Sequence, residues 1–348
     1  MNPYVLMILL SSLGLGTTLT FASSHWLLAW MGLEINTLAI VPLMAQHHHP
    51  RAVEATTKYF LTQATAAAMI LFASTTNAWM TGEWDLNNMS NPIASTMVIT
   101  ALALKIGLAP THFWMPEVLQ GLDLLTGLIM STWQKLAPLA LIMQTAQAID
   151  PLLLTALGLT STLVGGWGGL NQTQLRKILA YSSIAHMGWM IIILQYAPQL
   201  TLLALGTYIF MTSAAFLALK MSSTTKISTL TMTWSNSPIL TTTTALVLLS
   251  LGGLPPLTGF MPKWLILQEL TKQNLPISAT IMALAALLSL YFYLRLCYAM
   301  TLTISPNTIN STTPWRIQTT KTSLPLTIST TIALGLLPMT PAILTLAT

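Results

Sequence analysis

The chain of 348 residues carries very little charge, since 6% of its residues are charged and 53% are apolar. A soluble domain has roughly four times that share of charged residues on its surface. The composition therefore excludes a soluble protein and predicts an integral membrane protein. The net charge of +5 does not indicate nucleic-acid binding, because no basic cluster with interleaved aromatic residues accompanies it. The one cysteine, Cys297, excludes an intrachain disulfide and a cysteine-rich metal or iron–sulfur site.

Apolar runs of about 17–25 residues, long enough to cross a bilayer as helices, follow one another along the whole chain. Their linkers are short and contain Pro, Asn and Gly, so we expect one all-α membrane domain (1–348) without a soluble module. No secretory or transit peptide precedes the first run, and Met1 is expected to begin a retained span. The eleven expected spans are 3–21, 25–44, 55–80, 93–109 with a half-helix at 112–121, 124–146, 150–170, 174–195, 199–221, 238–272 (broken), 276–299 and 323–345.

The charges of the expected loops separate onto two sides of the membrane. The side of the N-terminus carries Arg51, Arg176, Lys177, Lys220, Lys226, Arg316 and Lys321. The opposite side carries Glu83, Asp85, Asp150 and Glu269, with Lys272 as its one clear cation. Because Lys and Arg are enriched in cytoplasmic and matrix loops, the N-terminus is expected on that side and the C-terminus on the other.

Two segments that start 146 residues apart, 107–119 and 253–265, are nearly the same sequence, with six of thirteen positions identical. Each copy interrupts a long apolar run. Paired Pro/Gly-interrupted membrane segments indicate a transport site, because unwound backbone inside a membrane has to line a cavity. The sequence therefore predicts an ion-translocating membrane protein. The residues expected to break the two helices are Gly107, Pro110, Gly253, Pro255 and Pro256.

Four ionisable residues fall well inside expected spans, namely Glu34, Lys105, Lys135 and Lys263. Each such residue costs roughly 2.5 kcal/mol or more in a membrane, so it is expected to face the bundle interior or water and to be functional. The structural alternative is a buried ion pair that holds helices together, or a lysine that extends to the interface.

Lysine suits proton transfer because its charge responds to its surroundings. Burial disfavours the ammonium form, and a nearby carboxylate favours it. We therefore expect Glu34 to modulate Lys105, although the sequence does not show their contact. His112 in the first break and His186, one turn after Ser182, are candidate proton carriers near neutral pH. The alternative for both is a hydrogen-bonded histidine that packs helices.

Three motifs resemble those of one protein family. The segment Arg176-Lys-Ile-Leu-Ala-Tyr-Ser-Ser-Ile-Ala-His186 is similar to a signature of the antiporter-like subunits of respiratory complex I. Lys105-Ile-Gly-Leu-Ala-Pro-Thr-His112 and the Gly-Gly-Leu-Pro-Pro-x-x-Gly-Phe run at 252–260 resemble that family too. The abundance of methionine (20 residues) is similar to that of proteins encoded in animal mitochondrial DNA.

This resemblance implies two inverted five-helix repeats, 3–146 and 150–299, with one broken helix each, and a last transmembrane helix at 323–345. It implies that Glu34 pairs with Lys105, that Lys135 is a central relay and that Lys263 is an exit-side lysine. At the exit-side position some members have glutamate instead. The implied proton relay is Glu34, Lys105, His112, Lys135, His186 and Lys263.

The same resemblance implies a core membrane subunit of a proton-translocating NADH:ubiquinone oxidoreductase in the mitochondrial inner membrane. Its N-terminus would face the matrix and its C-terminus the intermembrane space. NADH, FMN, the iron–sulfur clusters and ubiquinone would belong to other subunits, and no catalytic residue, metal site or nucleic-acid partner is expected. Expected partners are other membrane-arm subunits, including neighbouring antiporter-like chains, and lipids such as cardiolipin. The alternatives are a stand-alone cation/proton antiporter subunit and a structural scaffold whose buried charges lock helices.

Overall fold

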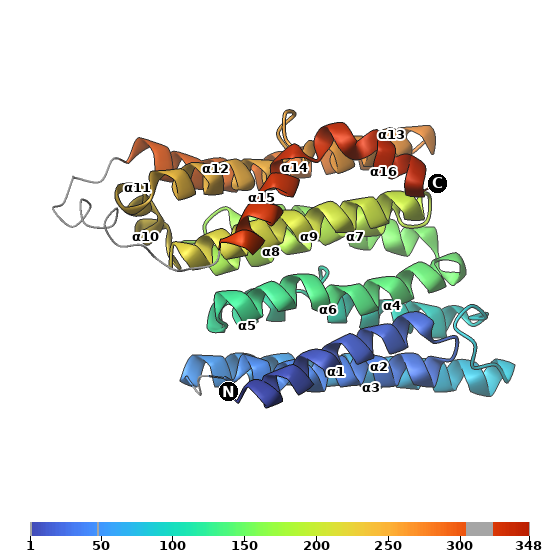
Figure 1. Ribbon diagram of the computed structural model, residues 1–348. Coiled ribbons are helices and arrows are strands. Elements are labelled where there is room, and N and C mark those ends of the chain that lie inside the picture. Colours follow the sequence, from blue (N-terminus) through green and yellow to red (C-terminus); the bar gives the residue numbers. More distant parts are fainter. Residues whose placement is uncertain (1, 47–48, 304–322, 348) are drawn as a thin grey trace. The chain divides into compact units, whose positions relative to one another are not determined.

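The computed structural model describes residues 2–46, 49–303 and 323–347, and every regular element in these ranges is a helix (Figure 1). The chain divides into two compact units, Met1–Ser161 and Thr162–Thr348, and the boundary falls inside the helix α7, Pro151–Gly169. Two of the cations that predict the orientation, Arg316 and Lys321, lie outside the described residues.

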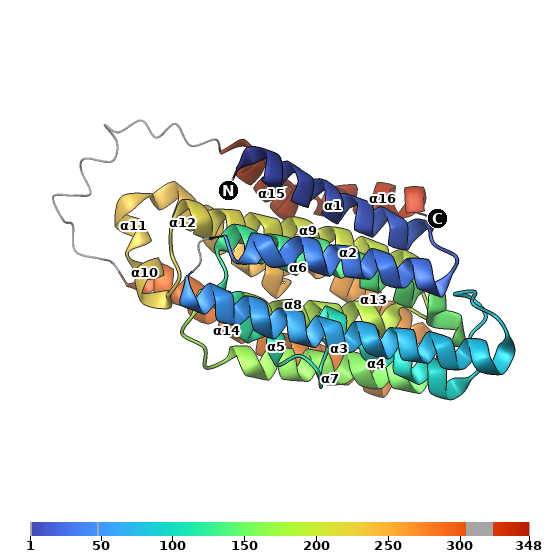
Figure 2. The same cartoon turned by 90° about the horizontal axis from the view of Figure 1, so that it is seen from below.

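The first unit consists of long helices and one short half-helix. Helix α1 packs along α2, and α3 lies beside α2, α4 and α5 (Figure 2). Helix α6 packs against α1, α2 and α4, so it reaches the interior of the unit. The helices are α1 Pro3–Ala22, α2 Trp26–Met44, α3 Pro50–Thr81, α4 Pro92–Ile106, α5 Trp114–Gly121 and α6 Leu124–Thr145.

Proline and a polar cap define the starts of three of these helices. Pro3, Pro50 and Pro92 occupy the first helical position, where the missing N–H costs nothing. The residue before each proline accepts a hydrogen bond from the first turn; His49 Nδ1, for example, accepts from Arg51 N at 3.2 Å. Because of this cap, α3 begins five residues before the expected residue 55.

The two predicted breaks have the same backbone design. Helix α4 ends at Gly107 and α12, Pro238–Gly252, ends at Gly253, and both glycines have φ +83. The Gly107 and Leu108 N–H groups both donate to the Ala103 carbonyl, and Gly253 and Leu254 N–H both donate to that of Leu249. This arrangement terminates a helix in a left-handed residue and satisfies its last carbonyls.

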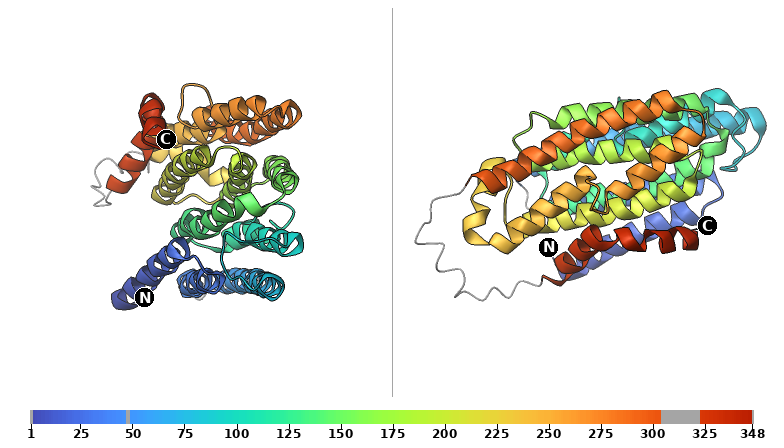
Figure 3. Two further views of the ribbon diagram at one scale, coloured as in Figure 1. Left: turned by 90° about the vertical axis from the view of Figure 1, so that its right-hand side faces the viewer. Right: turned by 90° about the horizontal axis from the view of Figure 1, so that it is seen from above.

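The second unit begins at Thr162 and so includes the second half of α7. Helix α14 runs beside α12 and α13, and α15 packs on α9 and α12 (Figure 3). The helices are α8 Leu175–Ile193, α9 Pro198–Met221, α10 Ile227–Thr231, α11 Thr233–Asn236, α12, α13 Phe260–Lys272, α14 Pro276–Leu302, α15 Leu324–Gly335 and α16 Thr340–Ala347.

The second unit differs from expectation in two segments. The short helices α10 and α11 lie between the expected spans 199–221 and 238–272, where the sequence analysis places no helix. The expected last helix at 323–345 is divided into α15 and α16 by a 3-10 turn at Leu337–Met339. Pro338 lies in this turn and has no N–H to continue an α-helix.

Five of the described helices are long and apolar enough to cross a membrane individually: α1, α2, α7, α9 and α14. Helices α4, α12 and α15 are apolar but shorter. Two of these three, α4 and α12, are the halves that precede the breaks. The architecture is therefore that of an all-helical membrane protein with interrupted helices.

Candidate functional site

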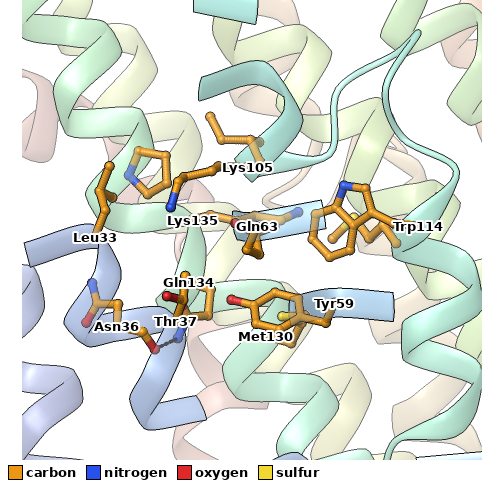
Figure 4. Close-up of a pocket in the computed structure, with 13 residues that line it drawn as sticks. Leu33, Asn36, Thr37, Tyr59, Gln63, Lys105, Trp114, Met130, Gln134 and Lys135 are labelled. Atoms are coloured by element: carbon orange, nitrogen blue, oxygen red, sulfur yellow. Dashed lines mark hydrogen bonds between the residues drawn. The ribbon is translucent and has the colours of Figure 1, made fainter. Parts of the chain in front are cut away.

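The first unit encloses a small polar cavity of about 10 Å³. Helices α2, α3, α4, α5 and α6 all contribute side chains to it. In Figure 4, Asn36 and Thr37 lie on one side, Tyr59 and Trp114 on the other, and Gln63 and the two lysines between them. The lining residues are Leu33, Asn36, Thr37, Tyr59, Gln63, Lys105, Ile106, Trp114, Met115, Met130, Gln134, Lys135 and Pro138.

Two of the predicted relay lysines, Lys105 and Lys135, line this cavity together. Their exposed fractions are 6% and 2%, so both are buried inside the unit. Lys105 lies in the last turn of α4, where the partial negative charge of the helix C-terminus stabilises its ammonium group. Lys135 lies on α6 three residues before Pro138, which cannot donate a hydrogen bond to the carbonyl of Gln134.

Glu34 on α2 is half-buried and interacts electrostatically with both Lys105 and Tyr59. Its carboxylate accepts a hydrogen bond from the Thr37 hydroxyl at 3.1 Å. Within the described part of the chain, Lys105 Nζ has no hydrogen-bond partner and forms no direct ion pair with Glu34. Glu34 and Lys105 therefore interact electrostatically without a direct contact between their charged groups.

His112 lies in the first break, between α4 and α5, and is buried. Its ring packs on Phe113 with centroids 4.4 Å apart and interacts with the Pro110 carbonyl. His112 is not among the residues that line the cavity. The break is also secured by Trp114, whose Nε1 donates to the Leu104 carbonyl at 3.0 Å.

The second unit places His186 on α8 beside buried hydroxyl groups. His186 Nδ1 lies 2.7 Å from the Ser182 carbonyl oxygen. A carbonyl can only accept, so Nδ1 carries the proton and Nε2 is the basic nitrogen of the neutral ring. The ring of Tyr208 lies 5.5 Å from that of His186, and the Tyr208 hydroxyl is hydrogen-bonded to Ser183. Tyr293 lies beside Ser182 and is fully buried.

Lys263 on α13 lies at the second break. Its Nζ donates to the Gly252 carbonyl oxygen at 2.8 Å, so the ammonium caps the C-terminal end of α12. In the aligned segments 107–119 and 253–265 its counterpart is Glu117, which forms an ion pair with Lys58 at 2.8 Å on an exposed surface. The same repeated position thus carries opposite charges in the two units.

Several other polar residues lie in the cavity of the first unit or near His186 and Lys263 in the second. The charges and histidines singled out from the sequence do not point to them. They are Asn36, Tyr59, Gln63 and Gln134 in the first unit and Tyr208, Tyr293 and Arg295 in the second. The asparagine and the glutamines lie inside apolar runs. Burying an amide there is costly unless it is hydrogen-bonded, so these residues could have indicated a polar site almost as well as a charge does. Arg295 donates from Nη1 to the Leu170 carbonyl at 2.7 Å and so fastens α14 to the end of α7. Among the described residues, no three His, Cys, Asp or Glu side chains meet as a metal site would require.

The interrupted helices and the buried lysines define a class of protein, the antiporter-like membrane subunits. The family described as "NADH:quinone oxidoreductase/Mrp antiporter, TM" matches residues 23–289, and "NADH dehydrogenase subunit 2 C-terminus" matches residues 290–344. The chain belongs to this family, and within it to the NADH-ubiquinone oxidoreductase chain 2 proteins.

Full-length relatives support this membership. The chain is 87% identical to NADH-ubiquinone oxidoreductase chain 2 of Carassius auratus and 79% identical to that of Danio rerio, over 348 residues and 100% of both chains in each case. Among solved structures, it resembles a chain of respiratory complex I from Thermus thermophilus with bound aureothin, with 29% identity and a TM-score of 0.87. The match covers 99% of this chain and 80% of that one.

Proposed function

We propose that this chain translocates protons through a relay of buried Glu, Lys and His side chains. As a chain 2 family member, it is a core membrane subunit of respiratory complex I, the proton-translocating NADH:ubiquinone oxidoreductase. The observation that carries the proposal is the cavity that Lys105 and Lys135 line together, with Glu34 in electrostatic interaction with Lys105. Two buried lysines and a carboxylate can exchange protons if the separation between them changes.

The relay consists of several stations rather than one long transfer. Moving one charge across a membrane costs roughly 2.3 kcal/mol per 100 mV. Several stations divide this cost into smaller steps. The first unit supplies Glu34, Lys105, Lys135 and His112. The second supplies His186, whose Nε2 is the basic nitrogen, and Lys263 at the second break.

The proposed layout is two inverted repeats, 3–146 and 150–299, with about eleven transmembrane helices in all. The matching Gly107 and Gly253 breaks support this layout. The N-terminus is proposed to face the matrix and the C-terminus the intermembrane space of the mitochondrial inner membrane, on the basis of the loop charges. NADH, FMN, the iron–sulfur clusters and ubiquinone are assigned to other subunits, and the lipid partners are proposed to include cardiolipin.

The relay is tested with Lys105→Ala in the assembled complex. We expect fewer protons transported per electron and slower coupled turnover, because the variant cannot hold a proton at this station. A native gel stained for NADH dehydrogenase activity, with mass spectrometry of the stained band, measures whether the variant chain still assembles. A normal proton-to-electron ratio in the assembled variant contradicts the relay.

The second candidate function is that of a structural scaffold, in which the buried charges only hold helices together. The contacts of Lys263 and Arg295 favour this structural role for these two residues. Both cations bind carbonyls at helix ends, as groups that hold helices together do. If the buried charges only lock helices, Lys105→Ala and Lys135→Ala prevent assembly and leave no complex whose pumping could change. The stand-alone antiporter is disfavoured because the full-length relatives carry the oxidoreductase name.

A further inference from the structure

Tyr293 on α14 is a buried tyrosine that contacts the residues to which His186 and Lys263 are bound. Its exposed fraction is 0%. Helix α14 packs against α8, α12 and α13, which carry Ser182 and His186, Gly252, and Lys263 respectively. All of these residues belong to the second unit. A tyrosine hydroxyl that is buried usually has a polar neighbour, so the neighbours of Tyr293 indicate what it does.

The hydroxyl end of Tyr293 faces α8. It interacts with the side chain of Ser182, whose exposed fraction is also 0%. The Ser182 hydroxyl donates to the Leu179 carbonyl at 2.8 Å, so its oxygen can accept from Tyr293. The Ser182 carbonyl oxygen in turn lies 2.7 Å from His186 Nδ1. One serine therefore connects the Tyr293 hydroxyl to the histidine ring.

The other end of the Tyr293 side chain packs on Gly252, the last residue of α12. A Cβ built on Gly252 would lie 3.7 Å from Tyr293 Cδ2 and 3.9 Å from Tyr293 Cβ, which is ordinary van der Waals contact. The Gly252 carbonyl oxygen accepts from Lys263 Nζ at 2.8 Å. A single side chain thus touches the residue that binds His186 and the residue that binds Lys263.

We infer that Tyr293 is a positioning residue that couples His186 to Lys263. Its hydroxyl holds Ser182, whose carbonyl keeps the proton on Nδ1 of His186 and leaves Nε2 as the basic nitrogen. Its ring supports the end of α12 to which Lys263 is bound. Because the ring is rigid, a shift at one of these contacts reaches the other. This role rests on the proposed proton relay, in which both residues are stations, and Tyr293 itself neither takes up nor releases a proton.

The test is Tyr293→Phe in the intact complex. Phenylalanine keeps the ring on Gly252 and removes the hydroxyl that faces Ser182. We expect normal assembly on native gels and fewer protons transported per electron. Ser182→Ala removes the same contact from the other side, retains the carbonyl that binds His186, and is expected to have the same effect. Tyr298→Phe is the matched control, because it removes one hydroxyl from α14 at a position that is 57% exposed, and it is expected to pump normally.

Double variants show whether Tyr293 acts through the two stations. Residues that act through one another have non-additive effects, whereas independent residues have additive ones. We expect Tyr293→Phe to cause no further loss of pumping in a His186→Asn complex, in which the basic nitrogen is already absent. We also expect its loss in a Lys263→Arg complex to be smaller than in the unaltered complex. Additive losses in either pair overturn the coupling.

The outcomes for this inference differ from those for the proposed function. Normal proton-to-electron ratios in both Tyr293→Phe and Ser182→Ala overturn the positioning role, and they leave the relay standing if Lys105→Ala still pumps fewer protons. Normal pumping by His186→Asn also overturns it, because the tyrosine then has no station to position. If Tyr293→Phe reduces the amount of assembled complex, Ser182→Ala and its double variants decide the question.

Discussion

Gly107 and Gly253, 146 residues apart, have the same backbone conformation, with φ +83 for both and ψ of 43 and 42. Each ends the first half of a broken helix, and each donates its N–H to the carbonyl four residues earlier. The two breaks are therefore one structural element used twice. The side chains beside the two breaks differ. Lys105 lies two residues before Gly107, whereas Leu251 lies two residues before Gly253.

The left-handed conformation at the first break makes Gly107→Ala a direct test of that element. An L-residue in this region costs roughly 1–2 kcal/mol, and the new Cβ would lie 3.2 Å from Met115 Sδ. We expect less assembled complex and a lower thermal midpoint for the membrane arm. Gly14→Ala is the control, because no atom lies within 4 Å of its built Cβ. Equal stability of the two variants contradicts a structural requirement for glycine at the break.

Much of this architecture follows from the sequence, because apolar runs, prolines and glycines act locally. Both breaks, their glycines and most helix bounds are predicted within a few residues. The start of α3 lies at Pro50 and not at the predicted residue 55, because the His49 cap and Pro50 extend the helix into a polar segment. The division of the last helix at Pro338 is missed because hydropathy remains high across it.

The candidate site is less predictable because it depends on which helix faces meet. The sequence singles out Lys105 and Lys135 by their charge, but it does not show that they share a cavity with Gln63 and Asn36. It also does not separate Lys263, which binds a helix carbonyl, from the cavity lysines. These distinctions depend on contacts between residues far apart in the chain.

Lys263→Arg separates capping from proton transfer at the second break. Arginine keeps the charge and can still donate to the Gly252 carbonyl, but it does not release a proton. We expect normal assembly with a reduced proton-to-electron ratio if Lys263 is a relay station. Lys263→Met is the companion variant, since it removes the charge at the end of α12, which is worth about 0.3–2 kcal/mol. Normal pumping by the arginine variant would assign Lys263 to capping alone.

His186→Asn tests the assignment of the basic nitrogen. The asparagine amide can donate to the Ser182 carbonyl as Nδ1 does, but it has no titratable nitrogen. We expect the variant to assemble with its α8 contacts intact and to pump fewer protons per electron. The comparison is His186→Leu, which loses both the hydrogen bond and the base. If the asparagine variant pumps normally, His186 serves helix packing, which is the alternative that the sequence left open.

The glycines of α7 hold it close to two neighbouring helices, and Gly168 is the most restricted. A Cβ at Gly168 would lie 2.3 Å from Cε1 of the Tyr181 ring. Tyr181 lies on α8, one residue before Ser182, so a shift of its ring would disturb the segment that orients His186. Overpacking of this kind typically costs about 1–3 kcal/mol.

We therefore expect Gly168→Ala to lower both the amount of assembled complex on native gels and its thermal midpoint. Gly206→Ala makes the same change in α9, where no atom lies within 4 Å of the built Cβ. The control is expected to be neutral or slightly stabilising, because alanine is favoured over glycine inside a helix by roughly 0.5–1 kcal/mol. If the two variants assemble equally well, the close approach of α7 to Tyr181 does not limit stability, and the position of His186 does not depend on it.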